Sequence, residues 1–274
     1  MNAKQRREYW IKVERLRLQL DNKYSSLFEG EIRKDLRLFA RDVEKFGPQA
    51  ARSLMGAYAW SEGMMKIMEA LYKEAAVIFG NASFRVLRID SQKAANPFGL
   101  NDDWIINVIN FLSLYGFTLV AEMTNTTKMR LNDIVSQAID EGKTNKEIAD
   151  IIMEEGGYSA MRAKRITRTE VMRASNYATM QGALSHRFEV DKVWISRKDS
   201  RTRRIPRNSY DHIDLDGKQV GYSEPFISLG KKGDTVTAQF PGDPTTPAGF
   251  TINCRCTIGF VPRRDQFGNL ILKR

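Results

Sequence analysis

The sequence predicts an α+β protein, with a helical N-terminal half followed by a small, turn-rich α+β C-terminal module. Two patterns support this prediction. Through most of the first 184 residues, apolar side chains recur at three- and four-residue steps, as they do along the buried face of a helix. After residue 189, short apolar runs alternate with segments rich in glycine and proline, which is typical of short strands joined by tight turns.

The composition is that of an ordinary globular chain, because 42% of the 274 residues are hydrophobic and 28% are charged. This balance excludes wholesale disorder, a collagen-like fibre and a small disulfide-stabilised scaffold. The first twenty residues carry charges throughout and lack the apolar core of a signal peptide, so we expect no secretory signal.

Several amphipathic segments make up the helical half. Residues 10–24 and 32–46 each carry an apolar stripe with helical spacing. The Gly47-Pro48 pair should end the second stripe, because proline cannot continue the hydrogen-bonding pattern of a helix. A third apolar segment follows at residues 54–79. Residues 81–97 are less regular, and we expect a short strand or a packed loop there.

An uncharged stretch at residues 104–121 approaches the length that would cross a membrane. Polar residues within it and acidic residues on both sides favour a helix buried in a bundle over a span through lipid. We therefore expect no contact with a membrane. Another helix is predicted at residues 126–142.

The end of the helical half is marked by local signals. Thr144 and Glu147 have the spacing of a capping box, which predicts the start of a short helix. Gly156 and Gly157 should close that helix. A long helix is then expected from about residue 159 to about residue 184.

The C-terminal module should begin near Glu189, where the pattern changes. The Asp216-Gly217 pair predicts a hairpin-type turn. Short strands are expected at residues 194–196, 219–222, 250–252 and 257–261.

Basic residues are concentrated in one region. The net charge is +10, and residues 162–207 alone hold thirteen basic and four acidic side chains. Such a block favours an anionic partner over a merely solvated face, and the arginine fork suits phosphate oxygens. We predict contact with double-stranded DNA that does not read its sequence. The candidate DNA-binding residues are Arg162, Arg165, Arg168 and Arg173 on a helix, and Arg197, Lys198, Arg201, Arg203, Arg204 and Arg207 in a loop.

A structural alternative applies to part of this helix. Glu170 can pair with Arg173 one turn later, and Thr169 can bond back to the helix backbone. Arg168, Thr169 and Glu170 would then serve the fold rather than a ligand.

The two cysteines, Cys254 and Cys256, are separated by one residue, and a disulfide between them would close a small, strained ring. Together with His212 they offer a donor set that suits zinc, and Asp199 or Asp211 could complete four-coordination. Because Cys-x-Cys is less usual than Cys-x-x-Cys, the alternative is a pair of buried thiols and a histidine bonded to a loop carbonyl.

The motifs of several enzyme classes are absent. The sequence has no phosphate-binding loop of the Gly-x-x-x-x-Gly-Lys-Ser/Thr type, no Gly-x-Ser-x-Gly nucleophile motif and no zinc deaminase pattern. We predict no catalytic residues. A metal-dependent nuclease built around His212 and the cysteines is the enzymatic alternative.

An ordered set of short motifs spans residues 125–262. They are Ile166-Thr167-Arg168-Thr169-Glu170, Ala174-Ser175-Asn176, Trp194, Asp199-Ser200-Arg201-Thr202-Arg203, His212, Asp216-Gly217, Phe226, Pro241-Gly242-Asp243-Pro244 and Asn253-Cys254-Arg255-Cys256. This order resembles that of the phage head morphogenesis proteins, the minor head proteins similar to protein F of bacteriophage Mu.

The resemblance implies a virion component that is made in the host cytoplasm and attached to the portal vertex inside the capsid. It implies roles in head assembly and in DNA packaging or ejection, with the portal protein as a partner and the major capsid protein as a second candidate. The alternative is an adaptor that binds an acidic portal surface without DNA. The expected organisation is a docking region at 1–124, a Mu F-like domain at 125–262 (helices at 125–188, module at 189–262) and a basic tail at 263–274.

Overall fold

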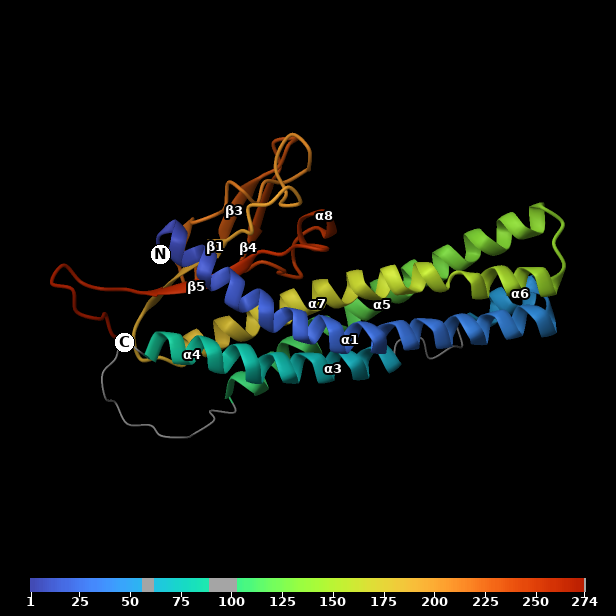
Figure 1. Ribbon diagram of the computed structural model, residues 1–274, viewed down its shortest axis with the longest axis horizontal. Coiled ribbons are helices and arrows are strands. Elements are labelled where there is room, and N and C mark those ends of the chain that lie inside the picture. Colours follow the sequence, from blue (N-terminus) through green and yellow to red (C-terminus); the bar gives the residue numbers. More distant parts are fainter. Residues whose placement is uncertain (56–61, 89–102, 274) are drawn as a thin grey trace. The chain divides into compact units, whose positions relative to one another are not determined.

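The computed structural model describes residues 1–55, 62–88 and 103–273 and has the expected α+β architecture (Figure 1). The chain forms two compact units, each assembled from separate segments. Unit 1 comprises Met1–Asp21, Leu71–Phe111 and Arg168–Arg274, and unit 2 comprises Asn22–Ala70 and Leu112–Thr167. The division into docking region, Mu F-like domain and tail stays a prediction about function.

The two apolar stripes predicted near the N-terminus belong to a single helix, α1 (Ala3–Phe46). No proline interrupts it, and an isolated glycine such as Gly30 costs a helix only about 1 kcal/mol. The helix ends where predicted. Gly47 adopts a φ of 83°, a left-handed conformation that favours glycine, and Pro48 begins α2 (Pro48–Leu54).

Helical structure continues where an irregular segment was expected. The elements are α3 (Glu62–Ala75), the π-helical turn η1 (Ala76–Gly80) and α4 (Asn81–Arg88). The predicted strand or loop is therefore wrong for residues 81–88, while residues 89–97 lie outside the described residues. Ser83 and Leu87, four residues apart, are both buried on α4. Because Ser83 is polar, the sequence pattern did not reveal this helical spacing.

Helix α5 (Asp103–Asp140) joins the two helices predicted at 104–121 and 126–142. Val108 and Val120 are fully buried, whereas Leu114 and Phe117 are 69% and 71% exposed. The expectation of a buried helix is therefore confirmed for one face only. Within the described ranges, α5 is the one helix whose length and composition would suffice to cross a membrane; the absence of membrane contact stays a prediction.

The predicted capping box is confirmed at the start of α6 (Asn145–Glu154). The backbone N–H of Thr144 donates to Glu147 Oε2 at 2.7 Å, and the backbone N–H of Glu147 donates to Thr144 Oγ1 at 3.3 Å. The predicted closure by glycines is wrong, because Gly156 is the first residue of α7 (Gly156–Leu184).

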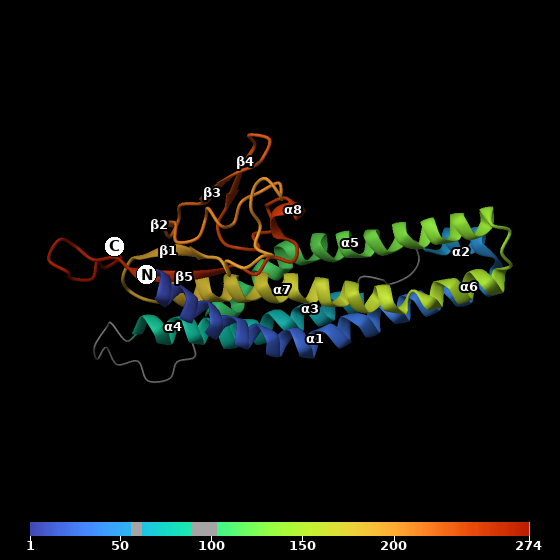
Figure 2. The ribbon, with the colours of Figure 1, turned by 45° about the horizontal axis from the view of Figure 1, so that its top comes forward.

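A three-stranded antiparallel sheet with the order β2-β1-β5 forms the centre of the C-terminal module (Figure 2). Its strands are β1 (Val190–Ile195), β2 (Gln219–Gly221) and β5 (Thr257–Pro262). Strand β1 starts four residues earlier than predicted. In the register of the sheet, Val193 lies opposite both Gln219 and Gly259.

The Asp216-Gly217 turn lies between β1 and β2, as the sequence predicts. Gly217 has a φ of 84°, and its N–H donates to Trp194 O at 2.8 Å. The side chain of Asp216 also accepts a hydrogen bond from Ser196 N at 2.8 Å. The turn therefore closes the loop that follows β1.

A second, two-stranded sheet was not predicted. It pairs β3 (Phe226–Leu229) with β4 (Thr235–Ala238). On β3 the polar Ser228 is buried, whereas the apolar Ile227 and Leu229 are exposed. This inversion of the usual apolar-in, polar-out alternation hid the strand.

The strand predicted at residues 250–252 is instead a short helix, α8 (Ala248–Thr251). Pro247 precedes it, and the N–H of Phe250 donates to Pro247 O at 2.8 Å. The fixed φ of proline suits the entry into a helix, and this local effect outweighs the strand preference of Phe250-Thr251-Ile252.

Strand β1 connects the start of α1 to the centre of the module. Val193 and Ile195 pack with Trp10 of α1 on one face. Residues of the opposite parity point to the other face, where the Trp194 ring lies 5.3 Å from the ring of Phe226 and 5.6 Å from that of His212. These contacts place His212 in a buried aromatic environment.

Candidate functional site

The ten basic residues predicted to bind DNA do not share one environment. Arg162 and Arg165 belong to unit 2, and the other eight belong to unit 1. Arg162 is only 8% exposed, and its guanidinium donates to Met123 O. Its burial and its bond to the backbone make it unsuited to reaching a phosphate.

Arg173 is also buried and has a structural partner. Its guanidinium pairs with the carboxylate of Glu170, which is 1% exposed, and its Nε donates to Gly242 O at 2.8 Å. Tyr72 donates its hydroxyl hydrogen to Glu170 Oε2 at 2.9 Å, and burial raises the pKa of Tyr72 well above its usual value. The structural alternative is therefore correct for Arg173 and Glu170, and Arg173 is not placed to contact DNA.

Arg168 and Thr169 position the segment that carries the cysteines. Arg168 Nη1 donates to Asn253 Oδ1 at 2.9 Å, and Thr169 Oγ1 accepts a hydrogen bond from Asn253 N at 3.0 Å. Asn253 has a φ of 59°, a conformation that asparagine tolerates better than most residues. Helix α7 thus fixes the turn immediately before Cys254.

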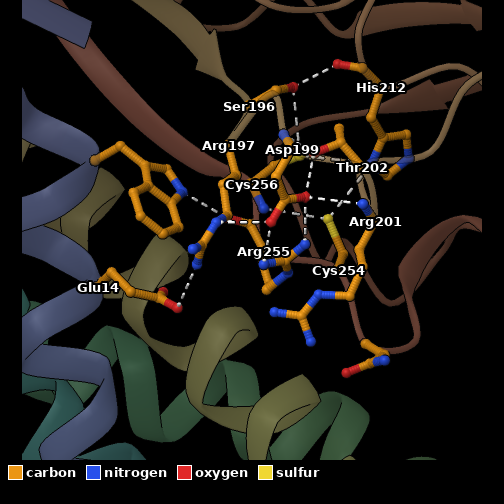
Figure 3. A network of polar contacts seen from close by, with 12 residues as sticks. Glu14, Ser196, Arg197, Asp199, Arg201, Thr202, His212, Cys254, Arg255 and Cys256 are labelled. Carbon is orange, nitrogen blue, oxygen red and sulfur yellow. Dashed lines mark hydrogen bonds and ion pairs between the residues drawn. The ribbon is translucent and has the colours of Figure 1, made fainter. Parts of the chain in front are cut away.

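Asp199 is held by arginines (Figure 3). Its two carboxylate oxygens accept hydrogen bonds from Arg255 at 2.6 and 2.7 Å, and Arg197 Nε lies 2.7 Å from Oδ2. The Arg255 guanidinium holds the pKa of the Asp199 carboxyl well below its usual range. Asp199, predicted as a metal ligand, is therefore engaged in ion pairs.

The first two cations of the loop also have acidic partners. In addition to Asp199, Arg197 approaches Glu14 at 3.9 Å, and Lys198 Nζ lies 2.7 Å from Asp216 Oδ2. The Arg197 guanidinium lies 4.7 Å from the centre of the Trp10 ring. Arg197 and Lys198 thus join the loop to α1 and to the 216–217 turn.

The remaining four arginines of the loop form no ion pair with any acid among the residues that the structure describes: Arg201, Arg203, Arg204 and Arg207. Arg203 donates to Ile252 O at 2.5 Å and Arg207 donates to Thr202 O at 2.9 Å, so both are tethered to backbone carbonyls. Arg201 and Arg204 are exposed. We call these four residues the arginine loop.

His212, Cys254 and Cys256 come together as predicted, and all three are buried. His212 Nδ1 lies 3.4 Å from Cys254 Sγ and 3.5 Å from Cys256 Sγ. His212 Nε2 has no hydrogen-bond partner in the part of the chain that the structure describes. The expected alternative, a histidine bonded through its ring to a loop carbonyl, is not what the structure has.

The environment of the two sulfurs is asymmetric. The hydrogen bond with Cys256, followed by the nearby His212, lowers the pKa of Cys254 well below its usual value, whereas burial raises the pKa of Cys256. The backbone N–H of Cys256 donates to Cys254 Sγ at 3.4 Å, and Ser196 Oγ lies 3.5 Å from Cys256 Sγ. Cys254 is therefore the more acidic of the two thiols.

The cysteine–histidine cluster and part of the arginine loop line the same small pocket. Arg197, Arg201 and Arg203 lie on it together with His212, Cys254 and Cys256. The sequence suggested two separate features, and the structure joins them. Sequence reasoning missed Arg255 and Asn253 as site residues, although both stand in the Asn-Cys-Arg-Cys string that it singled out.

The site lies within a part of the chain that matches a known family model. Residues 129–259, which include the arginine loop and the cluster, match the family model described as Phage Mu protein F like protein. This region is similar to the Mu F-like family. The resemblance expected from the motifs is thereby confirmed for residues 129–259.

Two curated relatives are similar to the chain. One is NAD(+)--arginine ADP-ribosyltransferase EFV of Enterococcus faecalis, with 31% identity over 173 residues, or 58% of this chain and 31% of the relative. The other is the uncharacterized protein YqbB of Bacillus subtilis, with 28% identity over 153 residues, or 56% of this chain and 48% of the relative. The matches thus span less than half the length of either relative. No solved structure is significantly similar to the chain.

Proposed function

We propose that the chain is a minor head protein of a phage that sits at the portal vertex inside the capsid and contacts packaged double-stranded DNA through the arginine loop. The Mu F-like match supports a phage head protein. The observation that carries the DNA contact is that Arg201, Arg203, Arg204 and Arg207 have no acidic partner among the described residues.

Charge and geometry favour a nucleic-acid partner for this loop. Residues 197–208 contain six basic side chains and one acidic side chain, and that acid, Asp199, is already paired with Arg197 and Arg255. Guanidinium groups bind phosphate oxygens and keep their charge. Contacts of this kind bind any DNA sequence and weaken as salt rises, because binding releases counterions. Packaged DNA presents such phosphates at high density.

The proposed docking surface for other head proteins is apolar. Leu114 and Phe117 on α5 are 69% and 71% exposed, and clusters of exposed apolar side chains usually mark contacts with other proteins. We assign this surface to the portal protein, with the major capsid protein as the second candidate. The proposed role in head assembly, packaging and ejection is structural; ADP-ribosyltransferase is the name of a relative of which the match covers 31%.

A paired charge reversal tests the DNA contact. R201E/R204E changes two exposed arginines and leaves Arg203 and Arg207, which hold backbone carbonyls, in place. The matched control is K231E/K232E, which reverses two exposed lysines in the β3–β4 turn. Binding to duplex DNA of random sequence is measured by fluorescence anisotropy over a series of salt concentrations.

We expect R201E/R204E to lower DNA affinity at least about tenfold at low salt and to reduce the slope of log K against log salt by about 2. The control should retain a slope near that of the wild type. Equal losses in both variants would mean that only net charge matters, and an unchanged R201E/R204E would contradict the proposed contact.

A separate measurement addresses the adaptor alternative. Portal protein is captured with the wild-type chain and with R201E/R204E after nuclease treatment, at low and at high salt. The DNA proposal expects equal capture by both proteins. If R201E/R204E loses the portal but not DNA, the arginine loop binds an acidic protein surface instead.

A further inference from the structure

The spacing of three buried side chains matches that of ligands around one metal ion. In a tetrahedral zinc site, Zn–S bonds of about 2.3 Å and Zn–N bonds of about 2.0–2.1 Å place sulfur and nitrogen ligands roughly 3.5 Å apart. His212 Nδ1 lies 3.4 Å from Cys254 Sγ and 3.5 Å from Cys256 Sγ. All three potential ligand atoms lie within 4.8 Å of one another.

The surrounding residues hold these ligands in place. Arg168 and Thr169 fix Asn253, the residue before Cys254. The His212 ring is packed edge-on against the ring of Phe250, with 4.4 Å between their centres. Each sulfur also has a polar neighbour, since Cys256 N donates to Cys254 Sγ and Ser196 Oγ lies near Cys256 Sγ. Such outer contacts orient ligands and stabilise thiolates.

Neither acid proposed from the sequence completes this set. Both oxygens of Asp199 are bonded to Arg255. Asp211 Oδ1 accepts hydrogen bonds from the backbone of residues 213 and 214, and its Oδ2 accepts one from the backbone of residue 205. The cluster therefore contains three protein ligands among the described residues. It borders the pocket lined by Arg197, Arg201 and Arg203.

We propose that His212 Nδ1 and the thiolates of Cys254 and Cys256 bind one zinc ion, whose fourth position faces the arginine-lined pocket and is taken by an exchangeable water or phosphate oxygen. Two thiols and a borderline-soft nitrogen favour zinc over magnesium or calcium. Binding forms two Zn–S bonds and one Zn–N bond, and the protons of the two thiols go to solvent. No oxidant or reductant is required.

Zinc binding by the three protein ligands is independent of the DNA contact, because none of them belongs to the arginine loop. Arg201 and Arg203 of that loop line only the pocket at the fourth position. A bound ion would join the loop that carries His212 to the segment that leads into β5. It would thereby stabilise the folded module, as any ligand does that binds only the folded state.

The first test measures metal in the full chain, purified under reducing conditions. After exposure to zinc and removal of excess metal, mass spectrometry should find about one zinc ion per chain. Cobalt substitution should produce a thiolate-to-cobalt charge-transfer band and the intense visible bands of four-coordinate cobalt. A wild-type chain that retains neither metal would overturn the proposal, without reference to any variant.

Variants then assign the ligands. H212Q and C254S should lose the metal, and circular dichroism establishes whether each is folded. D199N is the matched comparison, because it removes a nearby acid that is not a ligand, and it should retain about one zinc per chain. Loss of zinc in folded D199N would contradict the three-ligand set.

A titration of the cobalt-substituted chain with inorganic phosphate tests the fourth position. A change in the visible bands that saturates with phosphate is expected, and R201E/R204E should weaken the phosphate response without displacing cobalt. Bands that do not respond to phosphate, at any pH at which cobalt stays bound, would mean that the fourth position is not open to that anion.

Discussion

Two groups of arginines in unit 1 lie in opposite environments. Arg17 and Arg173 are 3% and 4% exposed, and each directs its donors to several acceptors within the fold. Arg201 and Arg204 are exposed and have no acidic partner among the described residues. The comparison shows that a count of basic residues does not distinguish arginines that build the fold from those available to a ligand; the number of acceptors around each guanidinium does.

The largest loss of stability should come from replacing Arg173. R173M leaves the buried carboxylate of Glu170 without its cation, so we expect the free energy of unfolding to fall by about 3–5 kcal/mol. Urea unfolding followed by circular dichroism measures the loss. The double variant E170Q/R173M removes the unpaired charge and should recover part of the stability. If R173M alone lowered the free energy of unfolding by less than about 1 kcal/mol, Arg173 would resemble the exposed arginines and the contrast would fail.

The second-largest loss of stability should come from replacing Arg17. Its guanidinium donates to Ser175 Oγ and Asn176 Oδ1 at 2.7 Å, and to Cys256 O and Thr257 Oγ1 at 3.1 and 3.2 Å. R17M strands these buried acceptors, and we expect a loss of about 2–4 kcal/mol. R15M, which changes an exposed arginine of the same helix, is the control and should cost less than about 0.5 kcal/mol. Equal losses of stability in R17M and R15M would mean that the buried hydrogen bonds of Arg17 do not stabilise the fold.

Asp199 should give an intermediate effect that depends on pH. Its side chain is 27% exposed, so we expect D199N to cost only about 1 kcal/mol at pH 6. Arg255 lowers the pKa of this carboxyl below its ordinary 3.8, so its stabilising effect is complete above pH 3.8 and declines as the pH falls through the folded-state value. Unfolding curves from pH 6 to pH 2 should therefore show the wild type and D199N converging in acid. If the difference in the free energy of unfolding between the wild type and D199N grew as the pH fell, the expected direction of the pH dependence would be wrong.

The smallest effect on stability should come from the exposed group. R201A/R204A should change the free energy of unfolding by less than about 0.5 kcal/mol, because both side chains are exposed. Its DNA affinity should nevertheless fall, as anisotropy would show. A stability loss above about 1 kcal/mol would make these arginines structural and remove the contrast with Arg17 and Arg173.

The features that the sequence predicted correctly depend on neighbouring residues. The capping box at Thr144, the break at Gly47 and the turn at Gly217 each follow from a few adjacent side chains or from the backbone freedom of glycine. The proximity of His212 to the cysteines was also predicted, because few other residues offer such donors.

The features that were missed depend on distant partners or on inverted patterns. Arg17 meets Ser175 from 158 residues away, and nothing near either residue signals this contact. Asp199 was predicted to be a metal ligand because the sequence does not reveal its ion pair with Arg255. That ion pair depends on how two loops pack. Strand β3 was hidden because Ser228 is buried and its apolar neighbours are exposed.

The contact of α1 with the C-terminal module has a consequence for how the molecule is made. Trp10 Nε1 donates to Arg255 O, 245 residues later, and Arg17 reaches Cys256 O, 239 residues later. On the ribosome, α1 is synthesised long before residues 255 and 256, so these contacts with the module form only after that later segment has emerged. A truncated polypeptide that begins at residue 129 would contain every Mu F-like motif and still lack two of the side chains that hold the Cys254–Cys256 segment.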